Sequence, residues 1–264
     1  MPYKVINRHL KILQSEIKIH NNKLRGALSL PSNDPYDQKI WSVSLYFSLL
    51  GLFKNIIFLL ENKDNLSGIF PLLRSCLDAY VNLKNVNFNY DKFLKSEKRK
   101  EFEEHKRIEE MDITTLTPEQ LKELFDCYKR YSNRVGKLST IEPTYMSEAD
   151  KRKAIKLTDS HEGLYNIASD YVHLSHIAIY QSQMKHLKNG YCTPTEVHRA
   201  PIGSLLVCLR ILMCVLWESI LIISFKTTQN NKSDNFNNIF RQLNLCNKAI
   251  DNKLKKINFP FLES

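Results

Sequence analysis

Residues that form tight turns are scarce in this sequence, with Gly 7 and Pro 9 among 264 residues. A sheet protein of this length needs a turn after each short strand, and glycine and proline supply much of the required backbone geometry. Helices need fewer connections, so the scarcity favours a helical fold. Hydrophobic residues make up 43% of the chain, which is enough for a sizeable core and too many for a disordered protein.

Capping residues mark where the helices should begin. Asp34-Pro35 precedes a predicted helix to about residue 62, and Ser67 precedes one to about residue 87. The capping box of Thr117-Pro118-Glu119-Gln120 begins a helix to about residue 137, and Ser147 with Asp150 begins a short helix. Ser160 precedes a long helix that ends near Asn189-Gly190, and Pro201 precedes a strongly apolar helix. No run alternates for long enough to propose a sheet. We therefore predict an all-α, multi-helix bundle that forms a single helical domain over residues 1–264.

Residues 91–112 carry both charge signs in nearly equal number. Opposite charges spaced three or four residues apart stabilise an exposed helix, so this segment is predicted to be a charged, projecting helix and not a nucleic-acid patch.

The net charge of +10 is concentrated at the two ends of the chain. Residues 1–27 hold six cations and one anion, residues 226–256 hold seven cations and two anions, and the remainder is neutral. Both ends show helical period, through Val5, Leu10, Leu13 and Ile17 and through Ile239, Leu243, Ile250 and Leu254. Clustered cations attract phosphate backbones and anionic membrane surfaces alike. The alternative is a compositional bias at exposed ends.

Six cysteines stand at positions 76, 127, 192, 208, 214 and 246 without any CxxC pair. Cys76, Cys208 and Cys214 lie in apolar runs, which predicts small core residues in a reducing compartment. The N-terminus has no uninterrupted apolar segment typical of a secretory signal, so a cytoplasmic location is expected.

Two long apolar stretches, 40–60 and 205–225, approach the length and composition of a membrane span. The first contains Lys54 and the second contains Arg210 and Glu218. A charge at the centre of a span costs roughly 2.5–3.5 kcal/mol. Both stretches are therefore predicted to be central helices of the bundle, without stable membrane insertion.

Strong catalytic and cofactor motifs are absent from the sequence. It has no glycine-rich phosphate loop, no HExxH, no GxSxG and no paired Cys/His set with zinc spacing. Asp170, His173 and His176 share a broad helix face, but one helix does not complete a tetrahedral metal site. We predict no metal and no cofactor.

Arg74 and Asp78 are charged residues within the apolar segment 69–87. Both fall on one narrow polar stripe, with Asn82 and Asn85, beside a broad apolar face. Arginine before aspartate is the less favourable order for an i,i+4 pair, so helix stabilisation explains the pair poorly. The alternative to a functional role is a structural salt bridge.

A second polar stripe runs along the segment 164–180. Its members fall within about 80° of one another beside an apolar face, and they are Tyr165, Ser169, His173, His176 and Tyr180. Histidine titrates near neutral pH, which suits general acid–base work. The alternative is a hydrogen-bonded core histidine flanked by aromatic rings. Buried charge must be paired, so the two stripes are expected to face each other.

The pairing of R-S-x-x-D (Arg74, Ser75, Asp78) with Y-x-x-x-S-x-x-V-H (Tyr165 to His173) resembles a bacterial family of unknown function, number 5677. The resemblance covers about residues 35–225 and leaves both basic ends outside. It implies an all-helical fold near the HEPN-type nucleases, which are enriched in toxin and anti-phage systems. HEPN ribonucleases carry R-x(4–6)-H on one helix, and neither helix here does. Only Arg99 and His105 have that spacing, inside the charged helix, where a match arises easily by chance.

The leading hypothesis is a metal-independent endoribonuclease or toxin-like effector of bacterial anti-phage (abortive infection) defence. His173 would be the general acid or base, Arg74 would stabilise phosphoryl charge and Asp78 would orient one of them. Substrate RNA would be contacted by Tyr165, Ser169, His176 and Tyr180. The alternatives are a non-catalytic helical interaction or regulatory protein and, third, a membrane-associated effector. A homodimer or a partner protein fits either of the first two.

Overall fold

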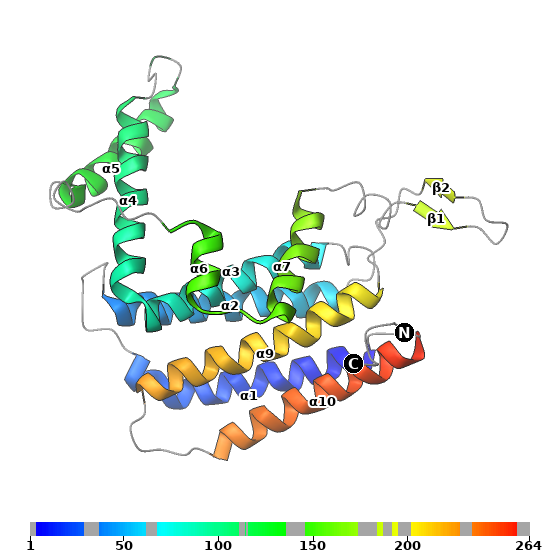
Figure 1. Ribbon diagram of the computed structural model, residues 1–264. Coiled ribbons are helices and arrows are strands. Elements are labelled where there is room, and N and C mark those ends of the chain that lie inside the picture. The colour runs from blue at the N-terminus through cyan, green and yellow to red at the C-terminus, as the bar shows by residue number, and fades with distance from the viewer. Residues whose placement is uncertain are drawn as a thin grey trace. The chain divides into compact units, whose positions relative to one another are not determined.

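The computed structural model describes residues 4–28, 37–61, 68–110, 114, 116–135, 146–173, 184–186, 192–194, 202–227 and 234–257. Its helices are α1 (Lys4–Leu28), α2 (Gln38–Glu61), α3 (Ile69–Phe88), α4 (Tyr90–Glu109), α5 (Pro118–Val135), α6 (Glu148–Ala154), α7 (Asp159–Val172), α9 (Ile202–Thr227) and α10 (Asp234–Lys256) (Figure 1). The strands β1 (Met184–His186) and β2 (Cys192–Pro194) form one antiparallel pair. The all-α prediction is confirmed.

The chain divides into two compact units. Unit 1 comprises residues 1–84 and 157–264, and unit 2 comprises residues 85–156. The single domain over residues 1–264 stays a prediction, because a compact unit need not fold by itself.

The two basic ends of the chain lie side by side in unit 1 as α1 and α10 (Figure 1). Each helix buries one apolar stripe on one side, as an amphipathic helix does. The exposed cations are Lys4, Arg8, Lys11 and Lys18 on α1 and Arg241, Lys248, Lys255 and Lys256 on α10. The buried stripes consist of Ile6, Leu10, Leu13 and Ile17 on α1 and of Ile239, Leu243, Cys246, Ile250 and Leu254 on α10. Val5, which was predicted to belong to the stripe, is 61% exposed, and Ile6 takes its place. The cations of both ends are thereby gathered on adjacent helices.

Helix α9 packs against α1, α2, α7 and α10 and is the central helix of unit 1. Two charged side chains within its apolar run, those of Arg210 and Glu218, are paired. Arg210 Nη1 lies 3.2 Å from Asp251 Oδ1 on α10, and Glu218 pairs with Lys84 on α3. A buried hydrogen bond of 2.9 Å between His20 and Ser224 joins α9 to α1. The charges that interrupt the apolar run therefore serve contacts between helices.

Helices α2 and α9 are both long and apolar enough to cross a membrane by length and composition alone. In the structure, 39% of the apolar window of α2 and 56% of that of α9 is buried against other helices. Core helices of a globular bundle pass the same test, so this property is weak evidence for a membrane span.

Three cysteines on three helices of unit 1 are buried: Cys76 on α3, Cys208 on α9 and Cys246 on α10. Burial raises the pKa of each thiol to about 12. Cys214 was predicted to be a core residue, which is wrong, because it lies on an exposed position of α9.

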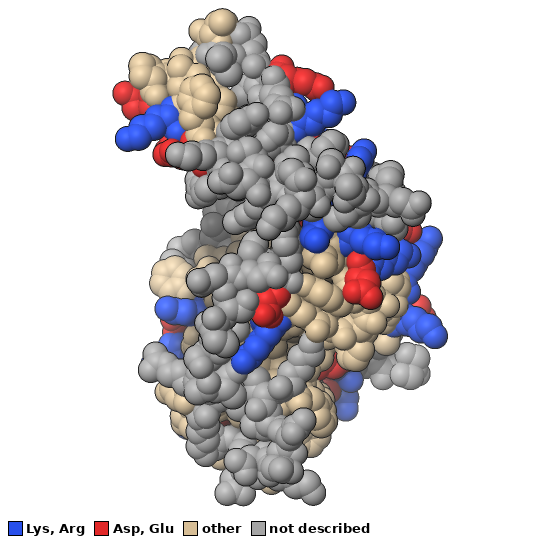
Figure 2. All heavy atoms as spheres, turned by 90° about the vertical axis from the view of Figure 1, so that its left-hand side faces the viewer, with Lys and Arg blue, Asp and Glu red and all other residues tan. Residues whose placement is uncertain are grey.

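Unit 2 contains the charged helix α4, and the predicted pairing along it is confirmed. Arg99 Nε lies 2.8 Å from Glu103 Oε1, and Lys106 Nζ lies 3.7 Å from Glu110 Oε1. Figure 2 shows cationic and anionic side chains of described residues next to one another on one face of the molecule. The pairing of Arg99 with Glu103 agrees with a structural role for Arg99.

Lysine 151 on α6 lies at the centre of unit 2, where its side chain is only 1% exposed. Its Nζ atom lies 3.0 Å from Glu97 Oε1 on α4, 3.3 Å from Glu148 Oε1 and 5.1 Å from the centre of the Phe93 ring. The N–H of Met146 donates to Ser96 Oγ at 3.0 Å. These contacts hold α6 and its preceding residues on α4.

Two of the predicted helix starts are confirmed as capping boxes. Thr117 and Gln120 exchange hydrogen bonds at the start of α5, at 2.9 and 3.3 Å. Ser147 and Asp150 do the same at the start of α6. The predicted cap of α2 is wrong: Asp34 lies outside the described residues, and Asp37 Oδ1 accepts from Lys39 N at 2.6 Å and from Ile40 N at 3.3 Å. The cap predicted at Ser67 lies outside the described residues.

The long helix predicted from Ser160 to Asn189 is also wrong. Helix α7 ends at Val172, where the His173 N–H donates to the Ser169 carbonyl, and Met184–His186 is a strand. Asn189-Gly190 was interpreted as a helix stop, but it falls between two paired strands. Asn189 and Gly190 themselves lie outside the described residues.

Candidate functional site

The candidate site lies where α7 packs on α3 in unit 1. The ring of Tyr171 stacks on that of Phe70, with centroids 3.9 Å apart, and Leu164 and Ala168 are fully buried on the same side of α7. The two predicted polar stripes border this apolar contact, so the packing brings them together.

The guanidinium of Arg74 is the centre of the site. Its Nη1 donates to Ser169 Oγ at 2.5 Å and its Nη2 donates to the Tyr165 hydroxyl at 2.6 Å. The guanidinium carbon also lies 4.4 Å from the centre of the Tyr165 ring. The Ser169 hydroxyl donates to the Tyr165 carbonyl at 2.6 Å, so its oxygen remains free to accept from arginine. These bonds fix the plane and position of the guanidinium.

His173 follows the last residue of α7 and is exposed. Its Nε2 lies 3.4 Å from Arg74 Nη1. Arginine is always a donor, so Nε2 accepts in this contact, which places the ring proton on Nδ1. A separation of 3.4 Å is long for an N–H···N hydrogen bond, so the contact is weak and a better acceptor can replace it.

Asp78 completes the group from the next turn of α3. Its Oδ2 lies 3.8 Å from Arg74 Nε, which is an ion pair without a close hydrogen bond. The Arg74 side chain is 20% exposed and that of Asp78 is 39% exposed. The network is therefore partly open to solvent and not sealed in the core.

The structure thus joins Arg74 and Asp78 with Tyr165, Ser169 and His173, and the expected meeting of the two stripes is confirmed. The functional roles of these residues remain predictions. His176 and Tyr180 lie outside the described residues. Among the described residues, no group of three or more His, Cys, Asp or Glu side chains is placed to hold a metal ion.

A family model matches residues 39–191, which is more than half of the chain, and its description is a family of unknown function, DUF5677. The chain belongs to this family. The match includes both polar stripes and ends before α9, so the expected span of 35–225 was too long at its C-terminal side. Both basic ends lie outside it, as expected. Neither the curated proteins nor the solved structures that were searched contain a match.

A second polar cluster joins the DUF5677 region to α9, and sequence reasoning missed it. The Tyr80 hydroxyl donates a hydrogen bond to Glu218 Oε2. Lys84 Nζ donates to the same carboxylate at 3.0 Å and to the Tyr80 hydroxyl at 3.1 Å. The ring of His161 stacks on Tyr80 with centroids 5.5 Å apart. One glutamate within an apolar helix was the available signal, but the sequence does not name its partners.

The charges in this second cluster shift its pKa values in opposite directions. Burial alone would raise the pKa of Glu218, but the hydrogen bonds from Tyr80 and Lys84 outweigh it and lower that pKa. Burial, followed by the hydrogen bond to the Glu218 carboxylate, raises the pKa of Tyr80. At neutral pH the cluster therefore holds an ionised glutamate between a cation and a neutral tyrosine.

His161 is a buried titratable residue of unit 1. It is 5% exposed, its Nδ1 lies 2.6 Å from Thr158 Oγ1, and its Nε2 is buried without a hydrogen-bond partner among the described residues. Burial lowers its pKa, and the attraction of Glu218 offsets only part of this effect. In the unfolded chain the pKa of His161 is about 6.5, so the unfolded chain binds the proton more readily than the folded protein does. The contribution of His161 to the free energy of unfolding is therefore fully present above about pH 6.5. It is lost as the pH falls from there toward the lower pKa of the folded state.

We expect the free energy of unfolding to be lower at pH 5.5 than at pH 7.5, and the difference to shrink in His161→Phe, which keeps a ring on Tyr80 but does not titrate. Urea denaturation followed by tryptophan fluorescence at the two pH values measures both quantities. An equal difference in the parent and in His161→Phe would contradict this prediction.

Proposed function

We propose that this protein is a metal-independent endoribonuclease, or a toxin-like effector with that chemistry, acting in the cytoplasm in bacterial anti-phage defence. The observation that supports it is the Arg74 guanidinium, held by Ser169 and Tyr165 beside the exposed imidazole of His173. A fixed cation next to an acid–base group is what phosphoryl chemistry on RNA requires.

In the proposed reaction, His173 accepts the proton of a ribose 2′-OH. The 2′-oxygen attacks the neighbouring phosphorus, a 2′-O–P bond forms and the P–O5′ bond breaks. The 5′-oxygen leaves with a proton from water, and the hydroxide that remains takes the proton held by His173. The products are a 2′,3′-cyclic phosphate, a 5′-hydroxyl and the regenerated His173. No metal is needed for charge balance, because the guanidinium faces the negative charge that develops on the phosphoryl oxygens.

Arg74 has the donors for this role. Arginine carries five N–H donors, and three of those on Arg74 have an acceptor among the described residues. A phosphate oxygen is a better acceptor than the distant His173 nitrogen, so substrate binding would draw the guanidinium contact away from Nε2 and release that nitrogen to act as the base. Asp78 keeps Arg74 oriented, and Tyr165 offers an aromatic ring close to the substrate.

The rival is a non-catalytic interaction or regulatory protein, in which the same residues form a structural network. The two proposals share the geometry and differ in what His173 contributes. A catalytic histidine is dispensable for stability, whereas a structural histidine leaves unpaired groups when it is removed, at a cost of about 1–3 kcal/mol.

The test is His173→Ala, assayed for 2′,3′-cyclic phosphate release from a short RNA in the presence of EDTA. We expect cleavage to be lost while the melting temperature stays nearly unchanged, because His173 is exposed and its contact with Arg74 is weak. Asn166→Ala, an exposed position on the same helix, serves as the control and should retain activity. A parent without nuclease activity, combined with early unfolding of His173→Ala, would decide for the non-catalytic protein.

A further inference from the structure

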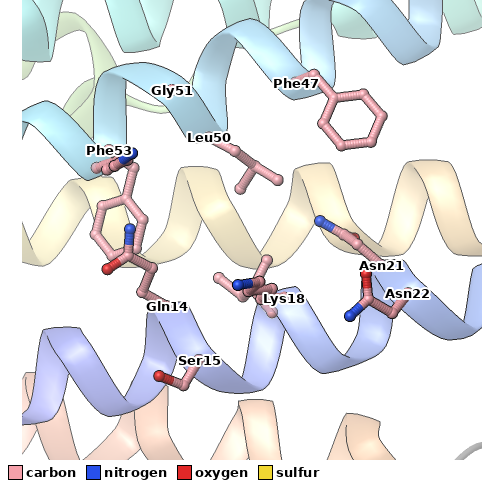
Figure 3. A pocket seen from close by; sticks show the side chains of 11 residues that line it. Gln14, Ser15, Lys18, Asn21, Asn22, Phe47, Leu50, Gly51 and Phe53 are labelled. Carbon is pink, nitrogen blue, oxygen red and sulfur yellow. The ribbon is translucent and has the colours of Figure 1, made fainter.

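A groove with a volume of about 880 Å³ lies between α1 and α2 in unit 1 (Figure 3). None of the residues around Arg74 lines it. Its apolar floor contains Ile17 and Phe53, which are buried, and Leu50, which points from α2 toward α1. Polar side chains of α1 border this floor.

The charge of the groove is entirely positive. Lys18 and Lys54 line it from the two helices and are exposed, and neither forms an ion pair with any described residue. No acidic residue belongs to the described lining. Lys11, two turns before Lys18 on α1, differs from these two lysines because it forms an ion pair with Glu61. Two uncompensated ammonium groups on opposite walls select for an anion that spans the groove.

An aromatic ring and side-chain amides accompany these charges. Phe47 lines the groove with 46% of its surface exposed, which is costly for a phenylalanine unless a ligand covers it. The amides are those of Gln14, Asn21 and Asn22. The Tyr46 hydroxyl donates to Asn21 Oδ1 at 2.9 Å, which leaves the Asn21 NH₂ group to donate to a ligand.

We propose that the α1–α2 groove binds single-stranded RNA, with a base stacked on Phe47 and phosphates at Lys18 and Lys54. Sequence-tolerant strand binding combines a cationic groove with an aromatic platform, and amides hydrogen-bond to base edges. The groove lies on α1, beside the cations of α10, which extend the attraction for a polyanion. The choice of RNA over DNA rests on the proposed ribonuclease function.

Gly51 gives a direct way to block the groove. It lines the groove on α2, and a Cβ added to it would have no atom within 4 Å. The first carbon of a larger side chain at this position therefore meets open space. Gly51→Leu should therefore occupy the groove while leaving the helix intact, because glycine is among the poorest helix formers.

The binding experiment uses the full chain and a fluorescein-labelled decamer of 2′-O-methyluridine, which cannot be cleaved through its 2′-oxygen. Phe47→Ala should weaken binding by about 5- to 150-fold, the range for loss of one stacked base. Lys18→Gln with Lys54→Gln should reduce the slope of log affinity against log salt by about 1.4, which is about 0.7 for each phosphate contact. Gly51→Leu should weaken binding as strongly as Phe47→Ala.

The controls carry matched changes outside the groove. Phe58→Ala removes an exposed ring from α2, and Lys92→Gln with Lys95→Gln removes two exposed charges from α4. Binding by the groove variants equal to that of these controls would overturn the proposal. Tighter binding of a deoxythymidine decamer or of a deca-glutamate peptide would overturn the choice of RNA.

Cleavage of unmodified RNA is measured in a separate assay. A failure of the groove proposal can then be distinguished from a failure of the ribonuclease proposal. A parent that binds through the groove without cleaving supports the groove and defeats the ribonuclease. A parent that cleaves RNA while its groove variants bind the decamer as the parent does defeats the groove and supports the ribonuclease.

Discussion

Replacing Arg74 with alanine should lower the rate of RNA cleavage by about 100- to 1,000-fold, the usual loss when one preorganised donor to a developing oxyanion is removed. Arg74→Lys should recover little of this loss. Lysine keeps the charge but cannot donate to Ser169 and Tyr165 in the geometry of a planar guanidinium, so the cation would no longer be fixed. Single-turnover cleavage rates at saturating protein measure both effects.

The control for this prediction is Arg241→Ala, which removes an exposed arginine from α10 and should leave the rate unchanged. Arg74 also joins α3 to α7, so the free energy of unfolding must be measured for each variant. Equal cleavage by the parent and by a folded Arg74→Ala protein would rule out the proposed role of the guanidinium.

The second large effect is expected in unit 2. Lys151→Met should destabilise this unit by about 3 kcal/mol, because it leaves the half-buried Glu97 carboxylate without its buried partner. Lys100 Nζ stays 3.1 Å from Glu97 Oε1 and limits the loss. Both tryptophans belong to unit 1, so their fluorescence does not report on unit 2. Hydrogen exchange of the α4 and α6 amides is the appropriate measurement.

The matched control is Lys106→Met on α4. The side chains of Lys106 and Glu110 are 64% and 66% exposed, and exposed pairs contribute about 0–1 kcal/mol. Adding Glu97→Gln to Lys151→Met should restore part of the lost protection, because the unpaired charge is then gone. Equal exchange rates in the Lys151→Met and Lys106→Met proteins would contradict the prediction.

The meeting of Arg74 with Tyr165 and Ser169 could be predicted because two local rules act together. Helical period places each residue on a polar stripe beside a buried face, and buried charge requires a partner. Neither rule needs knowledge of the rest of the fold. The same reasoning found the caps of α5 and α6, where the partners are three residues apart.

The cluster of Tyr80, Lys84, His161 and Glu218 could not be predicted in this way. Glu218 was conspicuous as a charge in an apolar helix, but its partners lie more than a hundred residues earlier in the chain. Several polar residues could equally well have been the partner that the Glu218 charge requires, and only the packing of α9 selects among them. The end of α7 at Val172 was missed for a different reason: the helical period of the polar stripe continues past this residue in the sequence, so no local signal marks the end.

The buried sulfurs of Cys76, Cys208 and Cys246 can report when individual helices of this protein leave the bundle. The thiolate is the form that attacks alkylating reagents. A thiol with a pKa of about 12 that is also shielded from solvent therefore hardly reacts while the helices stay packed. The three sulfur atoms lie on α3, α9 and α10. The rate at which each sulfur is alkylated therefore measures the release of a different helix. Mass spectrometry of alkylated peptides would thus show whether the helix that carries Arg74 leaves the bundle alone or together with the rest.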